Sequence, residues 1–369
     1  MVGQSGSGSI DGISLAPLTV LPDASLNAEC PTYLLDAAIT PLERFFVRNN
    51  GGLPSIEASE LNAWTIAIDG KVEKPQCFRL SELRERFKTV SVTAVLECAG
   101  NGRSTFEPKT DGLQWSRGAV ACLEWTGVRL ADVLRHCGIS SDAIYTGHHS
   151  RDKAPNGSEP ALSRGLPLAK ALAQETLLAF EVNGEPLGPL HGGPLRVVAP
   201  GFPGSAWQKW VERIELRDRV HDGAKMNGTD YRLPSRPIRP GEPVHETTFL
   251  VIEAMPINSM ITYPADGSVH EAGRNVEVRG FAWCGQHSVA GVSISTDGGQ
   301  VWQAADLEPE ADRFAWRRFR KWIPLHQQET EIIARAVDSS GQVQPLGTAA
   351  WNPRGYCNNG THKVRLQTG

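Results

Sequence analysis

The sequence changes character near residue 237, and this change limits what the chain can fold into. Before it, strand-like apolar runs mix with helical patterns in an irregular order. After it, short alternating runs are separated by turns. The stretch between them, RLPSRPIRPGEPVHE, is rich in proline and basic residues, as linkers often are. A length of 369 residues also exceeds what one hydrophobic core usually holds. We therefore expect two domains, 41–237 and 238–369, preceded by an extended segment, 1–40.

The second domain has the pattern of an immunoglobulin-like β-sandwich. Five short runs of alternating residues are separated by turns, and Asp-Gly-Gly at 297–299 lies between two of them. That tripeptide is a strong hairpin signal. The Cys…Trp…Cys spacing of antibody domains is absent.

The first domain is expected to be α+β, because its strands and helices do not alternate as βαβ units do. VSVTAVLECAG reads as a buried strand that runs into Cys98. VRLADVLRHCGI predicts a helix that ends at Gly138. Its apolar face comprises Val128, Leu130, Val133, Leu134 and Cys137. Residues 11–40 have several prolines and little periodicity, so we expect them to extend over the surface.

Composition excludes several classes of function. A formal charge of −4 disfavours nucleic acid or an anionic membrane as the main partner. No apolar run reaches the ~18–20 residues of a membrane span, and the first ten residues lack a signal-peptide pattern. The seven cysteines are odd in number and form no C-x-x-C pair. They predict neither a zinc site nor a disulfide framework, and most should be buried, inert thiols.

The stretch VLECAGNGRS contains the residues best suited to chemistry. A cysteine that only fills a core needs no glycines beside it, whereas one that binds a metal or attacks a substrate needs backbone to come close. Five cationic side chains also stand beside turns in apolar surroundings, and buried arginines need anions. These are Arg48, Arg103, Arg196, Lys209 and Arg354. His191 is equally consistent with a ligand, a hydrogen-bond donor or a loop histidine. Neither phosphate-loop motif is present.

Several motifs resemble the sulfite oxidase family. Its molybdenum domain is matched by FFVRNN, LECAGNGRS, GLQW, GAVACLEWTGVRLADVL, LLAFEVNGEPLGPLHGGPLRVVAPG and QKWVERIEL. Its dimerisation domain is matched by SISTDGGQVWQAADL, ARAVDSSGQVQP and WNPRG. The matches follow family order over about residues 41–365.

The resemblance implies a set of site residues. Cys98 corresponds to the cysteine that ligates molybdenum, a metal for which thiolate sulfur is well suited. The glycines after it would then let backbone pass close to the metal. The implied catalytic pocket consists of Arg48, Cys98, Arg103, Trp115, Tyr231 and Arg354. The implied cofactor site consists of Phe46, Arg48, Asn49, Cys98, His191, Arg196, Ser205 and Lys209. Gly102 departs from the family, because many animal members have a second arginine there.

The implied activity is oxidation of sulfite to sulfate by a molybdenum–molybdopterin cofactor, one per chain. Nitrate-reducing relatives usually depart at the positions of Tyr231 and Arg354, so retention of both favours sulfite. The chain before residue 41 is too short for a haem domain, and C-x-x-C-H is absent. We expect an external acceptor, a cytochrome c, and a periplasmic location, with the cytoplasm as the alternative. Oxygen as acceptor and another small oxyanion as substrate stay open.

The resemblance also implies a homodimer that is joined through residues after 240. The sandwich has more aromatic residues than its core is expected to hold, namely Trp302, Phe314, Trp316, Phe319 and Trp322. Exposed aromatic area on a β-domain is often covered by a partner.

Two functions of other classes are considered. A cysteine hydrolase would use Cys98 as nucleophile and His191 as base, but it gives the arginines no role. A non-enzymatic binding module built on the sandwich would leave the first 237 residues unexplained.

Overall fold

The first domain contains two sheets packed around one large core. The computed structural model describes residues 9–10, 13–157, 159–325 and 329–369. One sheet has the strand order β10 (Gly165–Pro167), β9 (Tyr145–Ser150), β14 (Val211–Arg217), β5 (Thr65–Gly70) and β6 (Gln76–Arg79). The other has the order β12 (Glu185–Pro186), β11 (Leu177–Val182), β8 (Val120–Arg129) and β7 (Thr89–Glu97), and β13 (Arg196–Val198) also pairs with β11. Only the β14–β5 pair is parallel among the pairs of these two sheets.

Helices are short and lie at the ends of the strands. They are α1 (Ala58–Ala63), α2 (Leu80–Arg86), α3 (Leu130–Cys137) and α4 (Leu168–Ala171), with single 3-10 turns at η1 (Thr32–Leu34), η2 (Leu42–Arg44), η3 (Arg103–Thr105), η4 (Pro189–His191), η5 (Gly204–Ala206) and η6 (Glu246–Thr248). Helix α3 ends at Gly138 as predicted, since that glycine adopts φ +72°. The prediction is wrong for Val128, which belongs to β8 and pairs there with Thr89 of β7 and Leu178 of β11.

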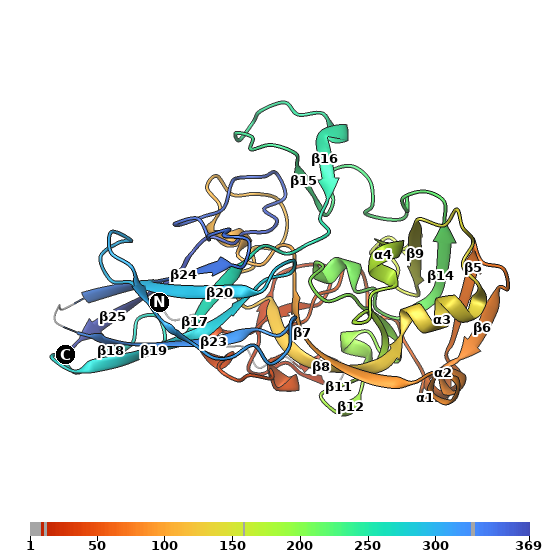
Figure 1. Ribbon diagram of the computed structural model, residues 1–369, viewed down its shortest axis with the longest axis horizontal. Coiled ribbons are helices and arrows are strands. Elements are labelled where there is room, and N and C mark those ends of the chain that lie inside the picture. Colours follow the sequence, from red (N-terminus) through yellow and green to blue (C-terminus); the bar gives the residue numbers. More distant parts are fainter. Residues whose placement is uncertain (1–8, 11–12, 158, 326–328) are drawn as a thin grey trace.

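The second domain is a β-sandwich, as predicted, so the α+β class with a following sandwich is confirmed. One sheet has the order β17 (Asn258–Tyr263), β19 (Asn275–Trp283), β23 (Arg317–Pro324) and β22 (Asp306–Leu307). The other has the order β18 (Val269–His270), β25 (His362–Thr368), β24 (Glu329–Asp338), β20 (Val289–Ser295) and β21 (Gln303–Ala304). The predicted hairpin around 297–299 joins β20 to β21. In Figure 1 the sandwich lies beside the first domain, and β15 (Arg232–Pro234) and β16 (Phe249–Val251) form a separate ribbon in the connecting region.

The segment before residue 41 is buried more deeply than the sequence predicts. Its residues 1–8 and 11–12 lie outside the described part of the chain; β1 (Ser9–Ile10) pairs with β2 (Ile13–Ser14), and β3 (Thr19–Leu21) with β4 (Asn27–Glu29). All three residues of β4 are buried, as are Cys30 and Leu35. The expectation that this segment extends over the surface is therefore wrong for residues 27–30 and Leu35, whereas Tyr33 and Ile39 are exposed. Cys30 and Leu35 pack in one cluster with residues of both domains.

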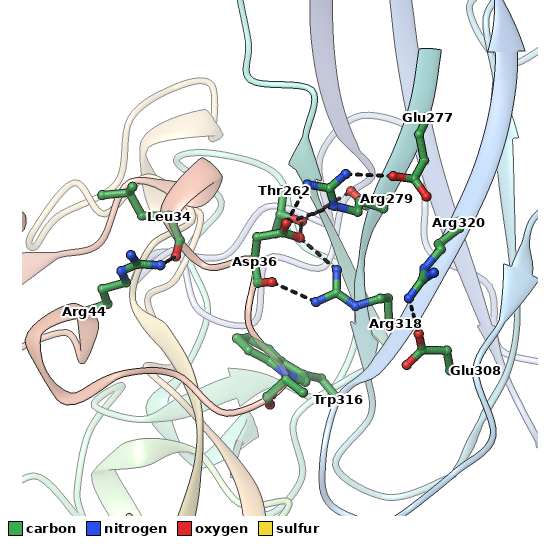
Figure 2. Close-up of polar contacts among 11 residues, drawn as sticks. Leu34, Asp36, Arg44, Thr262, Glu277, Arg279, Glu308, Trp316, Arg318 and Arg320 are labelled. Carbon is green, nitrogen blue, oxygen red and sulfur yellow. Dashed lines mark hydrogen bonds and ion pairs between the residues drawn. The ribbon is translucent and has the colours of Figure 1, made fainter. Parts of the chain in front are cut away.

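A cluster of paired charges joins that segment to the sandwich. Asp36 accepts hydrogen bonds from Thr262 Oγ1 at 2.6 Å, Arg279 Nε at 2.9 Å and Arg318 Nη1 at 2.9 Å (Figure 2). Arg279 is also bonded to Glu277. We call Asp36, Thr262, Arg279 and Arg318 the interdomain seam. Its arginines are neutralised by carboxylates from both sides of the junction.

Glu97, the last residue of β7, forms a second link between the domains. Its buried carboxylate accepts hydrogen bonds from Trp283 Nε1 at 2.8 Å, Asn258 Nδ2 at 3.1 Å and Asn101 Nδ2 at 3.0 Å. Trp283 and Asn258 belong to the sandwich. The sandwich is thus hydrogen-bonded to the residue directly before Cys98.

The aromatic residues of the sandwich divide among three environments. Phe319 lies in the sandwich core, whereas Trp316 packs against Phe281 and donates its Nε1 proton to the Ala38 carbonyl in the N-terminal segment. Trp322 is 61% exposed. The prediction that the core cannot hold all of them is confirmed for Trp316 and Trp322. Among the residues described, no helix has the length and apolarity to cross a membrane.

Candidate functional site

A cavity of about 60 Å³ lies in the first domain, beside the end of β7. Its wall brings together eight of the twelve predicted site residues from separate parts of the chain. These are Phe46, Arg48, Cys98, His191, Arg196, Ser205, Lys209 and Tyr231. We call this cavity the anion pocket, for reasons given by the charges in its wall. The other four predicted residues, Asn49, Arg103, Trp115 and Arg354, lie outside the lining.

Cys98 follows β7 directly, and its place depends on main-chain bonds. Its amide donates to the Ala119 carbonyl at 2.9 Å, and its own carbonyl accepts from the Asn101 amide. The residue is 8% exposed and its thiol is free. The end of β7 therefore places the Cys98 thiol in the pocket wall, and the amide and carbonyl of Cys98 are both hydrogen-bonded.

The glycines after Cys98 accommodate neighbouring protein groups. A side chain on Gly100 would collide with the guanidinium of Arg103. Gly102 adopts φ +79°, a left-handed conformation, and a Cβ there would lie 3.2 Å from Asn358 Nδ2. Gly102 thus adopts a backbone conformation that glycine tolerates best. The predicted close approach of this backbone to a metal stays a prediction.

Arg103 is buried directly behind this turn. Its Nε donates to the Arg354 carbonyl at 2.8 Å and its Nη1 to the Leu113 carbonyl at 2.7 Å. Burial lowers the pKa of the guanidinium, because a charged group loses its hydration there. Both hydrogen-bond partners are neutral, so the positive charge is left without compensation from them.

Arg48 is held by three asparagines. Its Nη1 donates to the Asn49 carbonyl and, at 3.2 Å, to Asn27 Oδ1, while its Nη2 donates to Asn50 Oδ1 at 2.8 Å. Asn50 Oδ1 also accepts the Tyr231 hydroxyl at 3.2 Å. This network orients Arg48 and Tyr231 toward the same cavity without adding a negative charge.

Lys209, Arg196 and His191 form another part of the pocket wall. Lys209 Nζ donates to Asn49 Oδ1 and to a carbonyl. Arg196 donates to the carbonyls of His191 and Trp207 at 2.7 and 2.9 Å. Burial lowers the pKa of Lys209 well below its ordinary value and that of Arg196 to about 9. It also lowers the pKa of His191, with help from Lys209 and Arg196, so the imidazole is neutral.

Two donors in this wall have no protein partner. Arg196 Nε and Ser205 Oγ are buried and form no hydrogen bond in the part of the chain that the structure describes. Buried polar atoms are normally paired, so each such atom calls for an explanation. Arg48, Arg196 and Lys209 bond to carbonyls and amides, and only Asp152 adds a carboxylate to the lining. Uncompensated cations and unpartnered donors make a fitting site for an anionic group.

Tyr231 lines the pocket and belongs to a column of stacked side chains. Its ring is stacked on Tyr356, with centroids 5.3 Å apart and an interplanar angle of 12°. Arg164 lies over Tyr231 at 5.1 Å, and Arg103 lies over Tyr356 at 5.3 Å. Tyr231 itself has φ 49°, which is uncommon for a bulky residue. The column holds this strained tyrosine beside the cavity.

Trp115 and Arg354 lie around the pocket rather than in its lining. Trp115 is fully buried, packs edge-on against Phe46 at 6.5 Å, and its Nε1 has no partner among the described residues. The Arg354 side chain is 37% exposed and pairs with Asp230 at 3.0 Å. Its predicted contact with substrate requires the guanidinium to turn away from that carboxylate.

Sequence reasoning did not select Asn27, Asn50, Arg164 or Tyr356. Asn50 ends the motif FFVRNN and Tyr356 follows Arg354 by two residues, so proximity to chosen residues was an available signal. Asn27 and Arg164 stand in stretches without a recognisable pattern. Their place near the pocket depends on contacts between distant segments.

The comparisons with known proteins agree with this site. Residues 50–225 match the model of an oxidoreductase molybdopterin binding domain, and residues 250–369 match a Mo-co oxidoreductase dimerisation domain. The mitochondrial sulfite oxidase of Mus musculus is 35% identical over 372 residues, covering 97% of this chain and 67% of the mouse protein. The chain thus spans about two thirds of that relative.

Two further relatives match most of their own length. The sulfite oxidase of Arabidopsis thaliana is 32% identical over 368 residues, covering 93% of this chain and 92% of the plant protein. The crystal structure of the sulfane dehydrogenase SoxCD from Paracoccus pantotrophus superposes with a TM-score of 0.79 at 29% identity, covering 94% of this chain and 85% of that chain. This chain belongs to the sulfite oxidase family of molybdopterin-binding oxidoreductases.

Proposed function

We propose that this protein oxidises sulfite to sulfate and passes the electrons to a separate acceptor. The observation that carries the proposal is the anion pocket, where Cys98 lies among cationic side chains whose bonds go to neutral groups. Sulfite is a small oxyanion whose charge matches such a wall. Its oxidation consumes one water and releases sulfate, two protons and two electrons.

The residues of the pocket fit the molybdenum–molybdopterin cofactor that the first domain implies. Cys98 would supply the thiolate ligand, and the unpartnered Arg196 Nε and Ser205 Oγ, with Lys209, suit the phosphate of the pterin. Phe46, Asn49 and His191 would complete the holding site. When bound, this cofactor supplies the oxygen-transfer and redox chemistry, while the protein supplies placement and electrostatics.

The remaining predicted residues would act on the substrate. Arg48 and Arg103 hold positive charge near the thiol and favour a dianion there. The Tyr231 hydroxyl donates to Asn50 Oδ1. It could donate to a substrate oxygen instead once substrate is bound. Buried Trp115 and Phe46 keep water out on one side, and Arg354 would join the substrate after leaving Asp230.

A cysteine hydrolase fits the site less well. Cys98 and His191 both line the pocket, but the His191 ring is stacked on Phe45 at 3.9 Å, and no hydrogen bond joins it to the thiol in the described residues. A nucleophile and its base need such a bond. Two cations with lowered pKa also have no task in that mechanism.

The acceptor, the location and the oligomeric state complete the proposal. We favour a cytochrome c acceptor in the periplasm over oxygen as the oxidant. The dimerisation domain supports a homodimer, and exposed Trp322 offers apolar area for it. Light scattering at micromolar concentration should give twice the chain mass of 40.1 kDa, and a monomer would refute this part.

The central test combines metal analysis with turnover. We expect about one molybdenum with a pterin per chain, and sulfite-dependent reduction of cytochrome c faster than consumption of oxygen. Nitrate and a sulfane-sulfur compound serve as competing substrates, because relatives act on them. A chain loaded with molybdenum that prefers either competitor would overturn sulfite as the substrate. A chain without molybdenum would overturn the whole assignment.

A further inference from the structure

We propose that Asn27 is a positioning residue of the anion pocket. Its neutral side-chain oxygen orients Arg48 and Asn49 without cancelling the Arg48 charge, and so helps to set the affinity of the pocket for oxyanions. This inference rests on the proposed function for its choice of ligand. It gives the N-terminal segment, which lies before the range matched by the molybdopterin binding domain, a part in the site.

Asn27 is fully buried, and its Oδ1 accepts two hydrogen bonds from the pocket wall. One comes from Arg48 Nη1 at 3.2 Å and the other from the Asn49 amide at 2.9 Å. A single oxygen therefore ties a guanidinium and the next peptide group to one point. Loss of that oxygen would free Arg48 on this side and leave a buried amide unpaired.

The orientation of this side chain is set by its other end. Asn27 Nδ2 donates to Asp23 Oδ2 at 2.9 Å and to the Ser25 carbonyl at 3.0 Å. Both partners are acceptors, so the nitrogen must face them and the oxygen must face Arg48. Asp23 is exposed, which places the acidic end of this bond outside the pocket.

The effect extends across the pocket through Asn49. The Asn49 Nδ2 donates to the Leu26 carbonyl at 2.8 Å, and its Oδ1 accepts from Lys209 Nζ. Residues 26 and 27 thus hold Asn49 and Arg48, and Asn49 in turn contacts Lys209. These two cations are linked through the neutral amide groups of Asn49.

A neutral group is required at this position. In the interdomain seam, Arg279 and Arg318 meet the carboxylate of Asp36, and their charge is compensated. An aspartate at position 27 would do the same to Arg48, and the arginine would then have less to offer an oxyanion. Asparagine provides the same hydrogen bonds as an acceptor and leaves the charge available.

Exchanging the residue types of two hydrogen-bonded positions, 23 and 27, tests this role. In the double variant Asp23→Asn/Asn27→Asp, the amide at 23 can donate to the carboxylate at 27, so the bond between the two side chains is kept in reverse. The net charge and composition of the protein are unchanged. The negative charge moves from the exposed position 23 to position 27, beside Arg48. Asp23→Asn alone is the matched control. Circular dichroism and thermal melting verify that all three proteins fold.

Two measurements on the purified 369-residue protein are needed. Isothermal calorimetry measures binding of inorganic sulfate, and steady-state kinetics measures the KM and kcat for sulfite. For the double variant we expect about a tenfold or greater loss of sulfate affinity and a similar rise in KM, with kcat changed about twofold at most. Asp23→Asn should stay within about twofold of wild type in both.

The outcomes separate this inference from the proposed function. If the folded double variant binds sulfate as wild type does, or if wild type binds none, the role of Asn27 is refuted. That result stands even if wild type oxidises sulfite. If sulfate binding falls as expected but sulfite is not oxidised by wild type, Asn27 keeps its positioning role and the substrate assignment fails.

Discussion

The anion pocket and the interdomain seam both contain arginines that are at least partly buried, and they differ in what those arginines contact. In the seam, Arg279 and Arg318 lie 2.8–2.9 Å from Asp36 oxygens, and Arg279 also pairs with Glu277 (Figure 2). In the pocket, Arg48 and Arg196 donate to carbonyls and amides. The positive charge of arginine is balanced by a carboxylate in the seam and has no such partner among these contacts in the pocket.

This difference teaches how to separate structural from functional arginines. A buried guanidinium beside a carboxylate satisfies both charges, so it holds segments together. One that meets only neutral acceptors keeps an electrostatic cost, which the lowered pKa of Arg196 reflects. A bound anion would remove that cost. Substitutions in the pocket should therefore change function more than stability, and substitutions in the seam should do the opposite.

The largest expected effect is at Cys98. Cys98→Ser should abolish sulfite oxidation and lower the molybdenum content in a protein that still folds, because a hydroxyl is a poor replacement for thiolate on this metal. Activity, metal analysis and urea unfolding measure the three quantities. Cys137→Ser, in the core face of α3, is the matched control and should cost about 1–3 kcal/mol of stability while turnover is kept. Equal loss of activity in both folded variants would remove the distinction.

The next effect concerns the pocket arginines. Arg48→Met should raise the KM for sulfite about 10- to 100-fold, since it removes a charge-assisted contact of roughly 1.5–3 kcal/mol. Arg354→Met should raise it less, because that guanidinium is half-exposed and already pairs with Asp230. Steady-state kinetics on both variants gives the comparison. A larger effect at Arg354 would show that ion pairing does not mark an arginine as structural.

The seam should respond in stability. Asp36→Asn leaves Arg279 and Arg318 without their shared carboxylate, and we expect a loss of about 2–4 kcal/mol in urea unfolding with the sulfite KM within about threefold of wild type. Glu308→Gln is the control: its partner Arg320 is 51% exposed, so the loss should stay below about 1 kcal/mol. A strong rise in KM for Asp36→Asn would mean that the two regions are not separable.

The smallest effect is in the pH dependence of stability. Burial opposes ionisation of Asp36, but hydrogen bonds from Arg279, Thr262 and Arg318 outweigh it and lower the pKa. A carboxyl whose pKa is lower in the folded state contributes stability above its unfolded pKa, near 4, and loses it as the pH falls through the folded value. Wild type should therefore lose more stability below about pH 4 than Asp36→Asn does. Parallel unfolding profiles for the two proteins would contradict this.

Local patterns were sufficient for much of the fold and for the centre of the site. The strand that ends at Cys98, the hairpin at 297–299 and the stop at Gly138 depend on neighbours a few residues away, and each was predicted. The boundary of α3 was misplaced at Val128, because an apolar residue with a suitable spacing fits a strand or a helix equally well. Motifs shared with the family supplied the candidates in the pocket.

The sequence alone determined which residue types are available for chemistry: a thiol at the end of a buried strand, cations beside turns, and a sandwich rich in aromatics. These follow from local spacing and from hydrophobic pattern, which act within a few residues. The tertiary structure decided which of these cations lie beside a carboxylate. Asn27 reaches Arg48 across 21 residues of sequence, and Asp36 meets Thr262 across 226. Such polar contacts depend on how distant segments dock, so only the packed chain distinguishes an arginine that holds the domains together from one left free for an anion.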